Sequence, residues 1–177
     1  MLEFSLRGER GRWVTVKVSG YSRASSDAFE INLLDCTVEV GHGGFRGQVA
    51  ADCTTTGLVD LVRDLDALIE GARTVATFGT SEGGLELRVE MGRTGHVMVS
   101  GTLRECAHLG PVLTFEFESD RGFLASARSE LKLIVREFPH PRCGRSHEAM
   151  SCTRGRGLTF AVPATVAVPA TPVILTV

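Results

Sequence analysis

The sequence contains no stretch close to the roughly 20 consecutive apolar residues that a membrane-spanning helix requires. Its first ten residues, MLEFSLRGER, lack the basic start and apolar run of a signal peptide. We therefore expect a cytoplasmic protein with no membrane partner. The five cysteines are an odd number without a regular framework, which suits a compartment where thiols stay reduced.

Motifs of common catalytic sites are missing as well. The chain has no G-x-S-x-G nucleophile turn, no H-E-x-x-H metal motif and no P-loop. The glycine-rich segment GHGGFRG does not fit G-x-G-x-x-G and connects two predicted strands, so it indicates a hairpin turn. Cys36 and Cys53 fall on apolar positions and are expected to be buried, unreactive thiols. We predict no enzyme activity and no cofactor.

Four side chains of the types that bind zinc lie within thirteen positions: His140, Cys143, His147 and Cys152. Their spacing, H-x2-C-x3-H-x4-C, is not that of a standard zinc finger. A chance cluster in an irregular segment is the interpretation that we favour, and no metal is predicted. The sequence leaves open whether these four residues ever bind one.

Charge is distributed unevenly along the chain, whose formal net charge is −2. Residues 1–137 hold 20 acidic and 15 basic side chains. Residues 138–177 hold four arginines and a single acidic residue, Glu148. A mildly acidic body argues against nucleic acid as a partner and permits a basic protein partner.

Alternation of apolar and polar residues predicts eight antiparallel strands, each with one packed and one solvated face. Glycine-rich turn signals separate several of them. The predicted strands lie at about 2–6, 14–18, 27–40, 45–53, 74–79, 85–91, 97–103 and 113–117.

The third of these segments, DAFEINLLDCTVEV, changes phase halfway. Its apolar side chains stand at odd positions up to Leu33 and at even positions from Leu34. We interpret the change as a β-bulge at Leu33–Leu34, because one extra residue reverses the faces of a strand and sharpens its twist. Two separate short strands are the alternative.

Two segments carry the helical period instead. In the first, around 54–71, a threonine among 54–56 is expected to cap the helix and Gly71 to end it. In the second, Asp120 is the expected N-cap and Pro139 stops the helix. The predicted fold is therefore α+β, with curved antiparallel sheet or sheets of about eight strands and two amphipathic helices in the order ββββα-ββββα.

The chain changes character near its C-terminal end. We expect residues 1–138 to form a single α+β domain. Five of the six prolines lie at 139 or beyond, where AVPAT occurs twice. Such low-complexity sequence does not readily close a core, so 139–177 is expected to be an irregular, disordered extension.

The segment FSLRGERGRWVTVKVSGYSRASSDAFEINLLDCTVEV resembles the start of WapI-type immunity proteins, small bacterial proteins found beside contact-dependent toxins. The family's aromatic residue, acidic stretch and Asn-Trp-Leu-like element correspond to Tyr21, Asp27 and the run Asn32-Leu33-Leu34, with leucine where the family often has tryptophan. The later layout is similar too, with an amphipathic helix, strands containing TGHVMVSGTL, and LTFEFESDRGFLASARSEL closing on a helix. The resemblance spans roughly residues 2–137.

This resemblance implies a function without catalysis, in which the protein binds a cognate protein toxin, often a nuclease, and neutralises it. Two acidic surfaces are candidates for the contact with the toxin: the outer face of the first helix and the solvated face of the sheet. Their residues are Asp60, Asp64 and Asp66 on the helix, and Glu86, Glu90, Glu116 and Glu118 on the sheet. The alternative function is a small-molecule binder or enzyme that uses a cavity in the curved sheet. A structural or oligomerising module is a third, and the oligomeric state is left open.

Overall fold

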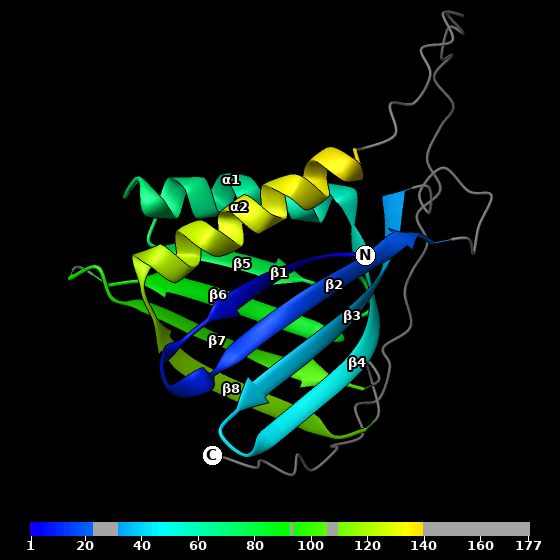
Figure 1. Cartoon of the computed structure of the whole chain (residues 1–177), viewed down its shortest axis with the longest axis horizontal. Coiled ribbons are helices and arrows are strands. Elements are labelled where there is room, and N and C mark those ends of the chain that lie inside the picture. Colours follow the sequence, from blue (N-terminus) through cyan, green and yellow to red (C-terminus); the bar gives the residue numbers. More distant parts are fainter. Residues whose placement is uncertain (23–31, 93, 106–109, 140–177) are drawn as a thin grey trace, which may run out of the picture. The chain divides into compact units, whose positions relative to one another are not determined.

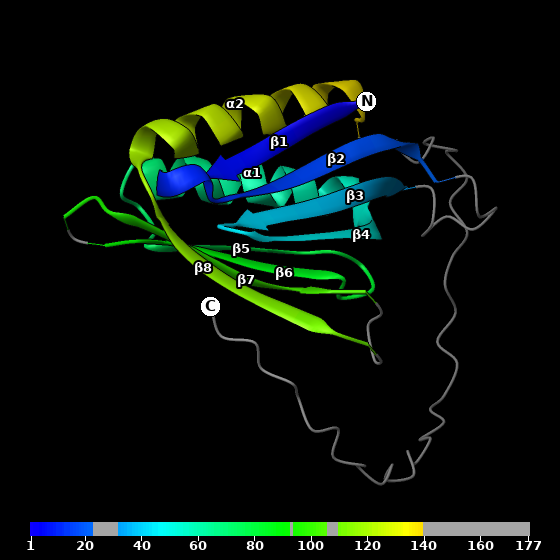
Figure 2. The same cartoon turned by 60° about the horizontal axis from the view of Figure 1, so that its bottom comes forward.

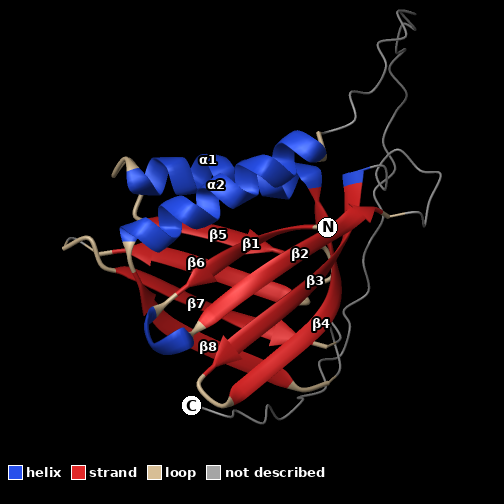
Figure 3. Cartoon of the chain, in the orientation of Figure 1, coloured by secondary structure: helices blue, strands red, loops and turns tan. Residues whose placement is uncertain are grey.

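Two four-stranded antiparallel sheets, each followed by a helix, make up the computed structural model (Figures 1 and 3). The structure describes residues 1–22, 32–92, 94–105 and 110–139. The first sheet has the strand order β1 (Leu2–Arg7), β2 (Trp13–Tyr21), β3 (Leu33–His42), β4 (Phe45–Thr54). The second sheet has the order β5 (Val75–Gly79), β6 (Leu85–Met91), β7 (Val97–Arg104), β8 (Val112–Ser119). The helices are α1 (Thr55–Ile69) and α2 (Arg121–Glu137), and a short 3-10 turn, η1 (Glu9–Gly11), joins β1 to β2.

This arrangement confirms the α+β prediction and the order ββββα-ββββα. All described residues belong to one structural unit of the chain. The expected extension at 139–177 lies outside them, apart from Pro139. Neither described helix combines the length and the apolar character that crossing a membrane would require.

Figure 2 shows the two sheets as two layers, and the apolar side chains of both sheets form one buried core. The rings of Phe4 and Phe78, one from each sheet, meet edge to face with centroids 6.2 Å apart. The sheets are also joined by hydrogen bonds, since the Ser119 hydroxyl donates to the carbonyl oxygen of Arg7 at 2.5 Å. Both sheets and both helices contribute to the core, which includes Leu6, Val16, Val38, Leu61, Leu87, Val99, Phe117 and Leu131.

The helices cover two edge strands, with α1 packed against β5 and α2 against β1. Glu130 of α2 accepts a hydrogen bond from the backbone N–H of Ser5 at 2.9 Å, so the helix satisfies a donor on the otherwise unpaired edge of β1. The predicted caps are confirmed. Thr54 accepts from the N–H of Gly57 at 3.0 Å, and Asp120 accepts from the N–H of Phe123 at 2.8 Å.

The prediction of a bulge at Leu33–Leu34 is wrong. These two residues begin β3 in regular register with β4, and residues 27–31 lie outside the described part of the chain. The irregularity is instead on β2, where the pairing with β3 shifts between Val18 and Gly20 and leaves Ser19 as the extra residue. A bulge disrupts the ladder locally, and the small side chains of Ser19 and Gly20 suit that position.

Gly101 on β7 provides a test of the close packing within the second sheet. A Cβ at this position would overlap the backbone carbonyl oxygen of Glu86 and stand 2.7 Å from the ring of Phe115. Because a paired strand cannot move aside, we expect Gly101→Ala to lower the free energy of unfolding by about 2 kcal/mol, measured by urea denaturation. Gly44→Ala is the control, since a Cβ there meets no heavy atom within 4 Å. Equal midpoints for the two variants would contradict the packing described.

Candidate functional site

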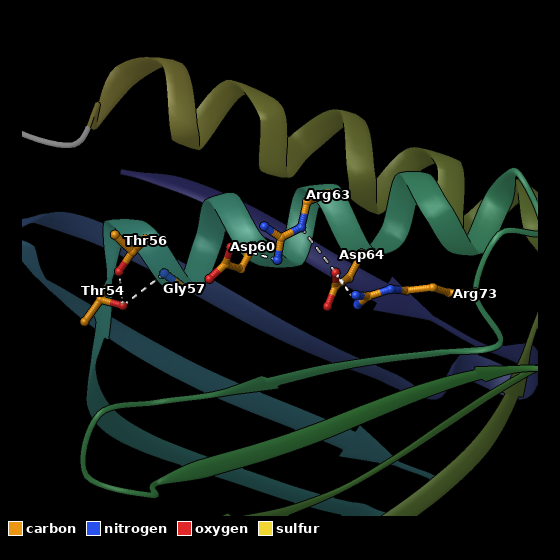
Figure 4. A network of polar contacts seen from close by, with 7 residues as sticks. All are labelled: Thr54, Thr56, Gly57, Asp60, Arg63, Asp64 and Arg73. Atoms are coloured by element: carbon orange, nitrogen blue, oxygen red, sulfur yellow. Dashed lines mark hydrogen bonds and ion pairs between the residues drawn. The ribbon is translucent and has the colours of Figure 1, made fainter.

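Two of the acidic residues predicted for the α1 surface already pair with basic side chains of the same segment (Figure 4). Asp64 accepts from Arg73 at 2.7 Å and lies 3.6 Å from Arg63, and its side chain is only 14% exposed. Asp60 lies 3.0 Å from Arg63 in an exposed ion pair one turn earlier. Little unbalanced negative charge therefore remains on this part of the helix.

The third helical acid, Asp66, lies where α1 meets α2. Its carboxylate is 3.1 Å from Arg128 and 2.9 Å from Lys132, both on α2. Partial burial acts to raise its pKa, but hydrogen bonds and charge from Lys132 and Arg128 together outweigh that effect and hold the pKa below its ordinary value of 3.8. Asp66 thus helps to join the two helices.

The four glutamates predicted for the sheet all lie on the outer face of the second sheet. Glu90 of β6 is in register with Met98 of β7, which is in register with Glu118 of β8. The next row across β6, β7 and β8 consists of Arg88, Ser100 and Glu116. The row after it consists of Glu86, Thr102 and Thr114. We call this surface the acidic sheet face and define it by Glu86, Glu90, Glu116 and Glu118.

Among the described residues, Arg88 of β6 lies among these four carboxylates, and Arg104 follows on the same outward phase at the end of β7. The guanidinium of Arg88 pairs with Glu90, with its Nε 2.7 Å from the carboxylate. Glu86 accepts a long hydrogen bond of 3.3 Å from the Thr102 hydroxyl. The remaining two glutamates, Glu116 and Glu118, are exposed and form no ion pair with any described residue. The face therefore keeps an excess of negative charge.

The acidic sheet face is hollowed in two places. A depression of about 610 Å³ is lined by Glu86 and Glu116 among others, and a second of about 380 Å³ is lined by Glu90 and Glu118. Each hollow thus contains two of the four glutamates. A concave acidic surface on a paired sheet suits a protruding basic group of another protein.

Other predicted site residues have structural explanations. Cys36 and Cys53 are free and buried, as predicted. A contact with Cys36 and then burial raise the pKa of the Cys53 thiol well above its ordinary value, so the reactive thiolate is disfavoured. Within the described residues no three histidine, cysteine or acidic side chains lie close enough to hold a metal ion. His140, Cys143, His147 and Cys152 lie outside them.

The structure also shows a hollow that the sequence did not predict. It lies on the outer face of the first sheet, has a volume of about 380 Å³ and is lined by Trp13 and Phe123 among others. The chain contains a single tryptophan, and its position on the solvated phase of β2 was the available signal. The contribution of Phe123 carried no such signal, because α2 lies far from β2 in the sequence.

The chain was compared with protein families, curated proteins and solved structures. The model of the "Immunity protein WapI-like family" matches residues 5–139. No curated protein matches the chain. A solved structure with similarity is titled "Crystal structures of trypanosoma bruciei MRP1/MRP2", with 9% sequence identity, a TM-score of 0.43, and coverage of 76% of this chain and 83% of that one. A likeness at this level supports no conclusion about the chain.

The position of Asp66 predicts a pH-dependent contribution to stability. Because its pKa is lowered on folding, its ion pairs stabilise the fold above the ordinary pKa of 3.8 and lose this effect as the pH falls through the lower folded value. We expect Asp66→Asn to cost about 1 kcal/mol at neutral pH and progressively less in acid.

Urea denaturation of both proteins across this pH range measures the difference. Asp60→Asn is the control, because its one ion pair is exposed and should contribute almost nothing. A difference for Asp66→Asn that stays constant into strong acid would contradict the assigned pairs.

Proposed function

The chain belongs to the WapI-like immunity protein family, and on this basis we propose that it neutralises a cognate toxin by binding it without catalysis. The family match at 5–139 covers nearly the same residues as the two sheets and two helices. Immunity requires only that a surface of this domain binds the toxin and blocks its activity. The function is therefore one of shape and charge.

We propose further that the acidic sheet face makes this contact. The observation that supports the choice is the pairing of the carboxylates: those of α1 are engaged with neighbouring cations of the chain, whereas Glu116 and Glu118 remain exposed beside two hollows. Among the described residues of these three adjacent strands, four carboxylates face two guanidinium groups, those of Arg88 and of Arg104 at the end of β7, so the field over the face is negative. Such a field accelerates encounter with a positively charged partner and disfavours acidic ones.

A basic toxin domain, such as a nuclease, is the partner that this charge fits. Nucleases that bind phosphate backbones carry basic surfaces, so an acidic face can cover the same surface that the nucleic acid would use. The rigidity of the sheet supports the proposal, because its backbone is held by β-ladders on three strands and by the core beneath. Little ordering is then required on binding.

The direct test uses the full chain and the C-terminal domain of a toxin encoded beside its gene. We expect binding with nanomolar affinity in calorimetry, and loss of the toxin's activity at equal concentrations of the two proteins. If no adjacent toxin domain binds, the proposed function is wrong.

The contact surface has its own prediction. The double variant Glu116→Lys with Glu118→Lys should slow association with the toxin roughly 10-fold to 100-fold at low salt, and the difference should shrink as salt increases. Surface plasmon resonance across a salt series measures the rate. Both positions are exposed, so the fold should be unaffected.

A matched control separates this face from net charge. Asp60→Lys with Glu137→Lys changes the total charge by the same amount at exposed positions on the two helices. We expect this control to slow association far less. Equal slowing by both variants would leave toxin binding intact as a function but reject the acidic sheet face as its site.

A further inference from the structure

Two hydroxyl side chains on the outer face of the first sheet are unexpectedly buried. Ser5 of β1 and Thr15 of β2 are paired in register on the face directed away from the core, yet they are only 6% and 7% exposed. Both line the hollow of about 380 Å³ that also includes Trp13 and Phe123. We call this hollow the Trp13 pocket.

The hydroxyl pair leaves a proton without an acceptor. Ser5 Oγ and Thr15 Oγ1 are 2.8 Å apart, and a single hydrogen bond between them uses one of their two protons. Neither hydroxyl has another hydrogen bond among the described residues. Since buried donors are almost always paired, the second O–H is suited to an acceptor that enters the pocket.

Charge in the Trp13 pocket is polarised along the strands. At one end Lys17 lies 2.6 Å from Glu39 and is in register with Glu3, so its charge is compensated. At the other end are Arg7 and Arg12, which form no ion pair within the described part of the chain. The Ser5–Thr15 pair lies in the row between the Glu3–Lys17 pair and the Arg7–Trp13 pair.

Aromatic side chains from two elements complete the pocket. The indole of Trp13 occupies the surface above Gly41, where a Cβ would stand 2.6 Å from the ring. Gly41 is in register with Trp13, so the absence of a side chain there leaves room for the indole over β3. Phe123, from the first turn of α2, is 36% exposed and also borders the pocket. A planar apolar group is the natural occupant of such a space.

We propose that the Trp13 pocket binds a small aromatic monoanion, with its acidic group toward Arg7, Arg12 and the free hydroxyl proton, and its ring against Trp13 and Phe123. The lining has three cations and two carboxylates, which favours a single negative charge over a phosphate dianion. The volume is near the lower end of the range for small-molecule sites.

This site is independent of toxin neutralisation, because it lies on the first sheet whereas the acidic sheet face belongs to the second. It also differs from the cavity function considered from the sequence, since it is on the outside of a sheet.

The chain's only tryptophan reports directly on the pocket. Titration of the full chain with benzoate should change the fluorescence of Trp13 in a saturable way. Benzamide, which has the ring without the charge, should bind about 10-fold more weakly, and acetate, which has the charge without the ring, should be weaker still. Calorimetry with the same compounds checks the affinities without an optical signal.

Variants of the pocket residues test where the carboxylate of benzoate binds. Arg7→Gln, at an exposed position, should weaken benzoate binding about 10-fold. Ser5→Ala with Thr15→Val should weaken it as well, with circular dichroism confirming that the fold is kept. Arg46→Gln is the control, because Arg46 is on the same outer face, in register with Gly41, but does not line the pocket.

Three outcomes would overturn the proposal: no saturable effect of benzoate, equal affinity for benzoate and benzamide, or equal effects of Arg7→Gln and Arg46→Gln. If the double hydroxyl variant does not fold, the arginine variants alone decide. None of these outcomes bears on the proposal of toxin binding, which is measured separately.

Discussion

Burial of two apolar sheet faces against each other is the interaction on which the rest of this structure depends. A four-stranded sheet with one apolar face cannot hide that face alone, and here each sheet covers the other, with Phe4 against Phe78 as one of the contacts. The helices then cover the edge strands β1 and β5. The inner faces are then closed to contact with other molecules.

The outer faces differ because the sheets have different neighbours. On the second sheet most outer side chains of β6 and β8 are exposed, and Glu116 and Glu118 form no ion pair with any described residue. On the first sheet, the N-terminal turn of α2 brings Phe123 to the pocket in which Ser5 and Thr15 are buried. The same kind of alternating strand thus produces an acidic surface in one sheet and a hollow with a buried hydroxyl pair in the other.

Much of the fold could be predicted because its signals are local. The caps Thr54 and Asp120 lie where polar residues precede an apolar stripe, and Leu58 and Leu131 are buried where the helical period placed them. The bulge was misplaced for a physical reason: the change of phase coincides with the start of β3 at Leu33, and alternation alone does not mark where a strand begins. The irregularity at Ser19 of β2 is a separate feature that only the pairing with β3 revealed.

The sequence by itself determined the elements, their order and the side of each strand that faces the core, because these follow from periodicity among neighbouring residues. Only the tertiary structure decided which polar groups are used internally. Asp66 meets its cations on a helix 62 or more positions later, and the edge of β1 is closed by Glu130, 125 residues from Ser5. Such contacts depend on how distant segments pack, and no local pattern in the chain records them.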